Sequence, residues 1–522
     1  MGIPSYFSYI IKKHRSIIKK HKNKKEFDFL YLDSNSIIYD IVKKLDYSKY
    51  LDNNLFEKTI IKNVIDKIEN YILTISPSTL SFIAFDGIPP LAKIQQQRLR
   101  RYKGFVREQI IKECLSESQE IWSASINITP GTLFMKKLNR ELKQYFSKKQ
   151  YDFKIKLSLS DEPGEGEHKL FEFIRNNKDI HHNKNILIYG LDADLIVLGL
   201  NHIPYCNCMY LIREAPNFIG SIDESMEPNE LYLLDLNQLE FGIRECFLNK
   251  KNIIHDYVFL MSLLGNDFMP HFPSLNIRSN GIETLISSYK KIINNNEYLF
   301  DGKIIYWDLV KKLISDLSLH ENEDIKEEYR KKQNKRLKFH KIVDKESLEL
   351  KLDDIPHQCR EEENYINPFE EGWESRYYKI LLNLDSTTYN MKKISHNYLS
   401  MLEWNMKYYS ESCPDWEMVY QYAYPPLLID LVEFIPTHNI HFISFKEPKI
   451  FDSYSLLAYV LPQEYHYLLP EELTKELKNT NWYSNNIKIH WAFCKYFWEA
   501  KIDFPKISIS DLKNICNKYN NE

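Results

Sequence analysis

Cysteine is scarce in this chain and shows no metal-site spacing. The 522 residues include eight cysteines. Cys206 and Cys208 form a CxC pair without companions at the spacings of zinc sites. Nothing in this pattern indicates a structural zinc site. The scattered cysteines favour reduced thiols in a cytosolic-type compartment over a disulfide framework.

Long apolar runs and an excess of basic charge are missing as well. No apolar run reaches the length needed to cross a membrane. Residues 1–25 lack the apolar core and the cleavage site of a signal peptide. The formal net charge is −3, whereas a generic binder of the phosphate backbone would be basic. Any nucleic-acid site must therefore be a local basic patch.

Apolar segments of strand length alternate with segments of helical spacing. The spacing predicts a buried strand followed by a turn over 27–40, a helix over 55–73 and a strand over 80–90 with a helix from Leu91. It also predicts a strand, tight turn and helix over 154–175, a strand, an acid pair and an apolar segment over 185–200, and, within 255–275, a helix that is ended by Gly265-Asn266-Asp267. This alternation predicts an α/β fold with a mostly parallel central sheet flanked by helices. In such sheets, sites form beyond the carboxyl ends of the strands.

Composition divides the chain into three parts. Residues 320–365 are dense in charge and poor in apolar periodicity. We expect a catalytic domain over 1–320, a charged linker or helix over 321–365, and a second lobe, rich in Trp, Tyr and Pro, over 366–522.

Two aspartates interrupt the apolar run "NILIYGLDADLIVLGL" (185–200), where unpaired carboxylates are costly. Other acids follow expected strands or helix ends, so seven carboxylates could meet at one edge. They are Asp33, Asp86, Glu165, Glu167, Asp192, Asp194 and Asp267. A single acid after a strand is more often a helix cap or a solvated loop residue. The combination of several such acids, each at the end of an apolar strand or a helix, is hard to explain as capping. Gly164 and Gly166 also let the backbone turn sharply, so that Glu165 and Glu167 project from it.

Carboxylates that converge need cations to neutralise their repulsion. Oxygen ligands select hard ions such as Mg²⁺ or Mn²⁺. Two ions roughly 3.5–4 Å apart can hold both the attacking and the leaving oxygen of a phosphodiester. The pattern therefore predicts phosphodiester hydrolysis with two Mg²⁺ ions, Mn²⁺ being an alternative, and with the seven acids as metal ligands and catalytic groups.

A basic helix is expected next to these acids. In "PPLAKIQQQRLRRYKGF" (89–105), four polar side chains fall at i, i+4, i+7 and i+8 and share one helical face. They are Lys93, Gln97, Arg100 and Arg101. A solvated cationic face is the plain alternative. Because the helix begins soon after Asp86, it is also suited to hold a terminal phosphate beside the metal site, which would impose cleavage from one end.

These motifs resemble those of the XRN family of 5′-to-3′ exoribonucleases. The resemblance runs in family order through "MGIPSYFSYI", "LYLDSNSIIYD", "AFDGIPPLAKIQQQRLRRYK", "SDEPGEGEHKLFEFIR", "YGLDADLIVLGL" and "LLGNDFMPHFPSL". More loosely, residues 371–382, 408–431 and 448–470 are similar to the family's second conserved region, which packs on the catalytic lobe and closes the pocket. The resemblance implies a PIN/FEN-like nuclease core with a mainly helical second lobe.

The resemblance also implies roles for single residues. The seven acids match metal-binding carboxylates, the four residues of the basic helix match the 5′-phosphate pocket, and Asn35 matches an active-site asparagine. Tyr39 stands where the family has a histidine that stacks on a base. "DWEM" (415–418) replaces a family SWSW block, which leaves Trp416 as a base-stacking or a core residue with equal weight. The zinc knuckle and the long C-terminal extension of some members are missing, which implies a compact, catalytic-core-only member, with a viral origin as one alternative.

Together these features indicate an Mg²⁺-dependent, processive 5′-to-3′ exoribonuclease that degrades single-stranded, 5′-monophosphorylated RNA to mononucleotides in RNA decay. The expected setting is a cytoplasmic monomer without a membrane partner, in the host cytoplasm for a viral protein, acting after a decapping enzyme. The alternatives are a structure-specific 5′ flap endonuclease and a catalytically silent RNA-binding scaffold.

Overall fold

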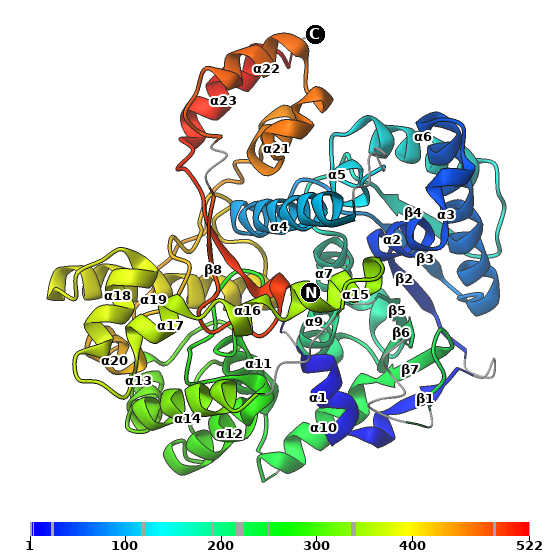
Figure 1. Ribbon diagram of the computed structural model, residues 1–522. Coiled ribbons are helices and arrows are strands. Elements are labelled where there is room, and N and C mark those ends of the chain that lie inside the picture. Colours follow the sequence, from blue (N-terminus) through cyan, green and yellow to red (C-terminus); the bar gives the residue numbers. More distant parts are fainter. Residues whose placement is uncertain are drawn as a thin grey trace.

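A seven-stranded sheet forms the centre of the N-terminal half of the chain (Figure 1). The computed structural model describes residues 3, 5–21, 26–115, 122–190, 192–215, 224, 226–248, 250–335, 341–483 and 487–520. The strands of this sheet are β1 (Ile18–Lys20), β2 (Phe29–Asp33), β3 (Leu80–Ala84), β4 (Lys154–Ser158), β5 (Asn185–Tyr189), β6 (Cys208–Glu214) and β7 (Leu231–Asp235). Their order is β1-β7-β6-β5-β2-β3-β4. The five strands from β6 to β4 are parallel, while β7 pairs antiparallel with β6 and β1. The predicted mostly parallel α/β sheet is confirmed.

The strand register brings the carboxyl ends of the central strands to one edge. Asp33 at the end of β2 pairs with Ala84 at the end of β3, and Ala84 pairs with Ser158 at the end of β4. On the other side of β2, Leu32 pairs with Tyr189 at the end of β5. Chain segments that leave these four strands therefore emerge close together, where a site of the expected kind would form.

Helices cover both faces of the sheet because alternate strand residues point to opposite sides. Leu30 and Leu32 pack with helices α2, α3 and α6, whereas Phe29 and Tyr31 pack with α7, α9 and α10. The helices of this half are α1 (Tyr6–Lys13), α2 (Asn35–Lys44), α3 (Asn53–Ile75), α5 (Ala124–Asn127), α6 (Leu133–Ser147), α7 (Gly166–Asn176), α8 (Lys178–His181), α9 (Asp194–His202) and α10 (Leu236–Cys246). The predicted flanking helices are therefore present on both faces.

One local prediction is wrong. The segment 27–40 was expected to end in a turn, but α2 begins at Asn35, directly after Ser34. The residues Asn35 and Ser36 are typical of turns, yet Ile37, Ile38 and Ile41 of this helix are buried against the sheet. The packing of these isoleucines against the sheet favours a helix, and it outweighs the turn propensity of Asn35 and Ser36.

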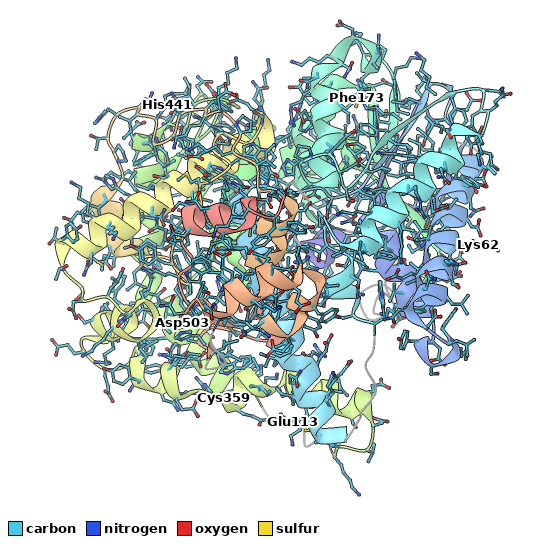
Figure 2. All side chains as sticks on the ribbon, turned by 90° about the horizontal axis from the view of Figure 1, so that it is seen from above. Lys62, Glu113, Phe173, Cys359, His441 and Asp503 are labelled. Atoms are coloured by element: carbon cyan, nitrogen blue, oxygen red, sulfur yellow. The ribbon has the colours of Figure 1, made fainter. Side chains whose placement is uncertain are left out.

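The C-terminal half is mainly helical and shares a core with the sheet. One continuous cluster of buried side chains runs from Phe29 and Ile186 in the sheet to Trp307 and Trp404 in the helices. The helices are α11 (Ile253–Ser262), α12 (Gly281–Ile292), α13 (Trp307–Ser318), α14 (Glu321–Gln333), α15 (Lys345–Asp353), α16 (Ile355–Gln358), α17 (Glu361–Ile366), α18 (Trp373–Leu382), α19 (Thr388–Ser410) and α20 (Leu428–Phe434). Figure 2, seen from above, places Lys62 of α3 and His441 at opposite sides of the molecule.

The basic helix α4 (Leu91–Leu115) begins at the predicted residue and crosses the middle of the molecule (Figure 1). Its Leu91 and Ile94 pack against a small C-terminal cluster that contains α21. That part of the chain consists of α21 (Ser453–Val460), α22 (Glu471–Lys478) and α23 (Ile509–Asn517), with a hairpin of β8 (Lys488–His490) and β9 (Lys501–Asp503). Among the described residues, no helix is both long and apolar enough to cross a bilayer.

The charged segment 321–365 holds helices α14 to α17 with residues 336–340 outside the described part. Helix α14 is not a solvated spacer, because its Ile325 and Tyr329 are buried in the cluster that also contains Trp373 and Tyr377. The division into three parts at 320 and 365 stays a prediction.

A buried carboxylate joins α14 to α20 and gives a pH-dependent stability. Glu321 is 3% exposed and accepts the backbone N–H groups of Leu428 and Ile429 at 2.7 and 3.0 Å. Burial raises its pKa from 4.5 to about 7. The folded chain thus binds this proton more tightly than the unfolded chain. The stabilisation is fully present below pH 4.5 and is lost as the pH rises through 7.

We therefore expect wild type to lose up to about 3 kcal/mol of unfolding free energy relative to Glu321→Gln between pH 4.5 and 8. Urea unfolding of both proteins across this range measures the difference. Glu323→Gln is the matched control, since Glu323 lies on the same helix with its side chain 68% exposed. Parallel pH profiles of wild type and Glu321→Gln would contradict the assignment.

Candidate active site

Acidic side chains from five segments meet near the first turn of α4. Asp33 ends β2, Asp86 lies in the loop after β3, Glu165 and Glu167 lie at the start of α7, Asp192 and Asp194 lie at the start of α9, and Asp267 lies in the loop after α11. The first four segments leave parallel strands at the same edge of the sheet. The fifth comes from the helical half, so the site is built by both halves of the chain.

The carboxylates are close enough to change one another's proton affinity. Burial, and after it the charge of Asp86, raises the pKa of Asp33 well above its ordinary value. Burial, and after it the charge of Asp194, raises the pKa of Glu167 well above its ordinary value. Burial, and after it the charge of Asp267, raises the pKa of Asp194 to about 7. The structure thus brings every predicted carboxylate into one cluster, Asp33, Asp86, Glu165, Glu167, Asp192, Asp194 and Asp267.

Lys93 supplies positive charge inside this cluster. Its Nζ lies 2.5 Å from Glu165 Oε2 and 2.8 Å from Asp267 Oδ2, and all three side chains are at most 10% exposed. Burial alone would raise the pKa of Asp267, but Lys93 holds it below its ordinary value. A buried carboxylate is tolerated when a buried cation pairs with it. Lys93 is therefore part of the acidic cluster.

The close approach of the first strands to α7 depends on a glycine. The N–H of Gly166 donates to Asp86 Oδ1 at 2.7 Å. A Cβ at Gly166 would lie 2.8 Å from Asp33 Oδ1 and 3.4 Å from Asp86 Oδ1. Asn35 donates its side-chain amide to Asp86 and accepts the N–H of Asp86 at 3.2 Å. Asn35 therefore fixes the orientation of the Asp86 carboxylate.

Two tyrosines of α19 reach the cluster from the helical half, and sequence reasoning missed them. The hydroxyl of Tyr408 donates to Glu165 Oε1 at 2.7 Å, and that of Tyr409 donates to Asp194 Oδ1 at 3.2 Å. Both side chains are buried. The adjacent pair in "KYYSE" carries no charge and no catalytic spacing. Its only signal was the loose resemblance of its segment to the second conserved region.

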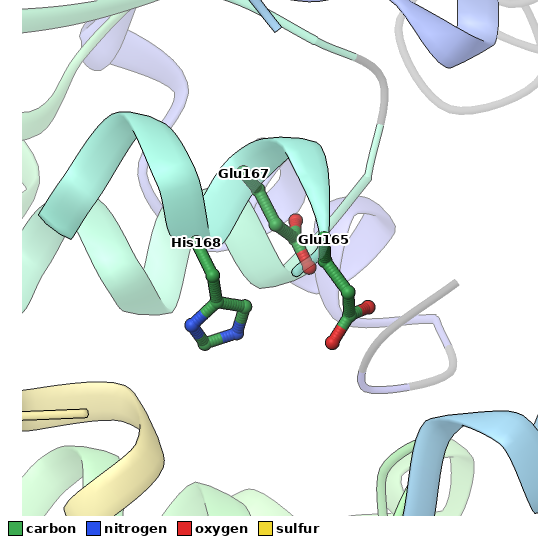
Figure 3. Close-up of side chains that lie close together, drawn as sticks. All are labelled: Glu165, Glu167 and His168. Atoms are coloured by element: carbon green, nitrogen blue, oxygen red, sulfur yellow. The ribbon is translucent and has the colours of Figure 1, made fainter. Parts of the chain in front are cut away.

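His168 is a second residue that was missed. Its donor atoms and those of Glu165 and Glu167 lie within 4.8 Å of one another, on the first turn of α7 (Figure 3). The ring stacks on Tyr408 at a centroid distance of 3.7 Å. Glu167 Oε2 and His168 Nε2 are buried and accept or donate no hydrogen bond within the described residues. The only signal was its place in "EGEH".

The donor set fits a divalent cation. It is dominated by carboxylate oxygens, which suit hard ions such as Mg²⁺, and the single imidazole is compatible with Mn²⁺. Burial lowers the pKa of His168 well below its ordinary value, so its ring is neutral and keeps a lone pair. The buried oxygen of Glu167 without a partner is the kind of atom that a bound cation would satisfy.

The side chains of the four predicted phosphate-binding residues do not all point into the same part of the site. Lys93 points into the carboxylates, whereas Arg101 is buried and donates to Thr129 Oγ1 at 2.7 and 3.2 Å. Gln97 is buried, and Arg100 is exposed and lines a separate cavity. The residues do share a face, but successive side chains rotate by about 100°, so Arg100 and Arg101 lie at its opposite edges.

The two predicted aromatic residues lie near α4. Burial lowers the pKa of Arg101 to about 10, and the nearby Tyr39 acts in the opposite direction. The Tyr39 side chain is 37% exposed, which leaves its ring accessible. The carbonyl of Trp416 accepts the N–H of Leu91 at 2.8 Å, so this segment packs on the first residue of α4.

The Tyr408 hydroxyl offers a test of the metal site. We expect Tyr408→Phe to keep the ring stacked on His168 but to leave Glu165 without its second hydrogen bond, and so to weaken Mn²⁺ binding by about 10- to 100-fold. Isothermal titration with Mn²⁺ in the absence of RNA measures this.

The matched control is Tyr398→Phe on the same helix. Tyr398 is fully buried, and its hydroxyl has no hydrogen-bond partner in the described part of the chain. Its variant should bind Mn²⁺ as wild type does. Equal affinities of wild type and Tyr408→Phe would remove the tyrosine from the metal site.

The chain is similar to a known protein family and to several of its members. The family description "XRN 5'-3' exonuclease N-terminus" matches residues 1–215, and "Xrn1 helical domain" matches residues 248–363 and 345–522. The 5'-3' exoribonuclease 1 of Saccharomyces cerevisiae is 27% identical, over 90% of this chain and 40% of that protein. The human 5'-3' exoribonuclease 1 is 28% identical, over 99% of this chain and 34% of that protein. The Drosophila melanogaster 5'-3' exoribonuclease 2 homolog is 25% identical, over 97% of this chain and 69% of that protein.

Among solved structures, the catalytic core of Rad2 in complex with DNA substrate matches with a TM-score of 0.33 and 12% identity, over 65% of this chain and 82% of that one. The chain spans less than half the length of the yeast and human relatives. The two family matches together extend from residue 1 to residue 522 with one gap at 216–247. The chain belongs to the XRN 5′-3′ exonuclease family.

Proposed function

We propose that this chain is a processive 5′-to-3′ exoribonuclease that hydrolyses single-stranded, 5′-monophosphorylated RNA to mononucleotides with Mg²⁺. The observation that carries the proposal is the convergence of the carboxylates around Lys93 at the N-terminal end of α4. The yeast and human relatives, which are named 5'-3' exoribonucleases, support the same activity.

The cluster would hold one or two Mg²⁺ ions, or Mn²⁺. Its ligands would be Asp33, Asp86, Glu165, Glu167, Asp192, Asp194 and Asp267. When bound, the ions supply Lewis-acid activation of water and neutralise charge on the leaving oxygen. The Tyr408 and Tyr409 hydroxyls orient two of the carboxylates, and the Lys93 ammonium can donate to a phosphate oxygen that enters the site.

The terminal phosphate would bind to α4, with Gln97, Arg100 and Arg101 beside Lys93. Thr129 holds the Arg101 guanidinium in place, so little side-chain entropy is lost when an anion arrives. The exposed ring of Tyr39 would stack on the leading base, a contact that tolerates any base. Processive degradation follows if this stacking and the phosphate contacts re-form after each step of one nucleotide. Trp416 would provide a second stacking surface or serve only in packing.

We further propose that the chain works as a monomer in the cytoplasm, or in the host cytoplasm if it is viral, in RNA decay. All eight cysteines are free, which supports a reducing compartment. A decapping enzyme would then supply the monophosphate ends. Capped and triphosphate ends carry additional groups that a pocket fitted to one phosphate excludes.

One RNA with different ends tests this proposal. A 3′-labelled RNA with a 5′-monophosphate should be degraded in Mg²⁺ and remain intact in EDTA. The same RNA with a 5′-hydroxyl or 5′-triphosphate should react at least about 10-fold more slowly, because each charge-assisted hydrogen bond to the phosphate contributes to binding. Circularised RNA should stay uncut. Cleavage of the circle would favour an endonuclease, and binding without any cleavage would favour the silent scaffold.

Asp192 provides a test of the carboxylates that is separate from folding. We expect Asp192→Ala to reduce cleavage by at least about 100-fold, since a lost ligand lowers the charge that holds the metal, while RNA binding, followed by fluorescence anisotropy, stays close to wild type. Asp161→Ala is the control, because Asp161 is an exposed acid paired with Lys143 at 2.6 Å. Cleavage by Asp192→Ala at the wild-type rate would exclude Asp192 from the site.

A further inference from the structure

A cavity of about 320 Å³ adjoins the carboxylate cluster on another side of α4. Asn266 and Asp267 line it, so it borders the proposed metal site directly. Arg100 and Lys103 of α4 line it, and so does Lys501 of β9. Gln97 and Arg101, which belong to the proposed phosphate-binding set, do not line it. The cavity is therefore a separate space that shares one wall with the site.

Three cations face this cavity without a carboxylate at ion-pair distance. Within the described residues, Arg100, Lys103 and Lys501 form no ion pair, and Lys103 donates only to the carbonyl of Trp498. Burial, and after it the charge of Lys501 and then that of Arg100, lowers the pKa of Lys103 to about 7. Cations that lower one another's proton affinity in this way are relieved by a bound anion.

Aromatic side chains also line the cavity. Trp498, Tyr424 and Phe493 line it. The guanidinium of Arg278 lies 5.8 Å from the ring centroid of Trp498, and it is fixed by Glu499 at 2.6 Å. A flat ring held in place beside a cation cluster is a surface for a base, because base–aromatic stacking does not depend on base identity.

We propose that this cavity binds a nucleoside 5′-monophosphate, with the phosphate at Arg100, Lys103 and Lys501 and the base against Trp498. The inference rests on the proposed function, since such a nucleotide is the product of that reaction. A processive enzyme must release each product while it keeps the remaining strand. A product site that borders the catalytic carboxylates, and that shares only Arg100 with the residues proposed to hold the next 5′ end, allows this.

The observations favour a single nucleotide over a longer strand. The volume is at the lower end of the range of about 300–1,000 Å³ that small-molecule sites occupy. The carboxylates of Asp267 and Glu499 also lie in the wall, and they would repel the successive phosphates of a strand. A second cavity of about 250 Å³ continues past Arg278 and Phe493 to Lys331 and Lys335. It offers a mononucleotide a cationic path towards solvent.

Photo-crosslinking with 8-azidoadenosine 5′-monophosphate tests the inference on the intact protein, with no RNA and no cleavage required. We expect tryptic peptide 496–501, which contains Trp498, to carry the label. Unlabelled AMP should compete at least about 10-fold better than adenosine, because the cation cluster recognises the phosphate. Label confined to peptide 26–43, which contains Tyr39, or competition by adenosine as strong as that by AMP, would overturn the inference.

A charge variant sharpens the assignment. Lys501→Gln should weaken AMP binding, measured by isothermal titration, by about fivefold or more. Lys506→Gln is the control on an exposed lysine outside the cavity, and it should bind AMP as wild type does. Unchanged affinity in Lys501→Gln would contradict the site. If AMP labels the cavity but no RNA is degraded, the nucleotide site stands and the proposed function fails. If RNA is degraded and the label lies elsewhere, the proposed function stands and the nucleotide site fails.

Discussion

The structure depends on the balance between a buried ammonium and the carboxylates that surround it. Burial alone would lower the pKa of Lys93, but Asp267 and Glu165 outweigh that effect and raise it well above its ordinary value. Without this cation, the acids at the edge of the sheet could not all be buried and ionised. Lys93 neutralises only part of the negative charge. The raised pKa values of Asp33 and Glu167 mark the remaining excess, which divalent cations would neutralise.

That charge balance explains why the two halves of the chain form one core. The sheet supplies most of the acids, but Asp267 comes from the loop after α11 and the two tyrosine hydroxyls come from α19. Phe268 packs edge-on against Trp404 and Tyr408, so the same helix that orients Glu165 also fills the core below it. A site assembled in this way cannot be completed by the N-terminal half alone. Packing between the halves is therefore a requirement of the chemistry as well as of stability.

The sequence sufficed for those parts of the fold and site that follow from local pattern. Parallel strands that end in acids predicted where Asp33 and Asp86 would lie, and the proline pair before Leu91 marked the start of α4. The sequence did not suffice where a single contact between distant residues determines the structure. The hydrogen bond from Tyr408 to Glu165 joins residues 243 positions apart, and no periodicity encodes it. The helix at Asn35 was missed because turn propensity is local, whereas the burial that overrides it is tertiary.

Helix α4 shows how a chain of net charge −3 can still carry a local group of cations. Its cations are divided by helical rotation among three surroundings. Lys93 balances the carboxylates, Arg101 is held by Thr129, and Lys103 faces a cavity with Lys501. Because every one of these charges is partly buried, it acts over a few ångströms and is screened little by salt. Under the proposed function, recognition of a phosphate at this helix would therefore depend on fit at one end of the substrate, without a diffuse attraction along the whole strand.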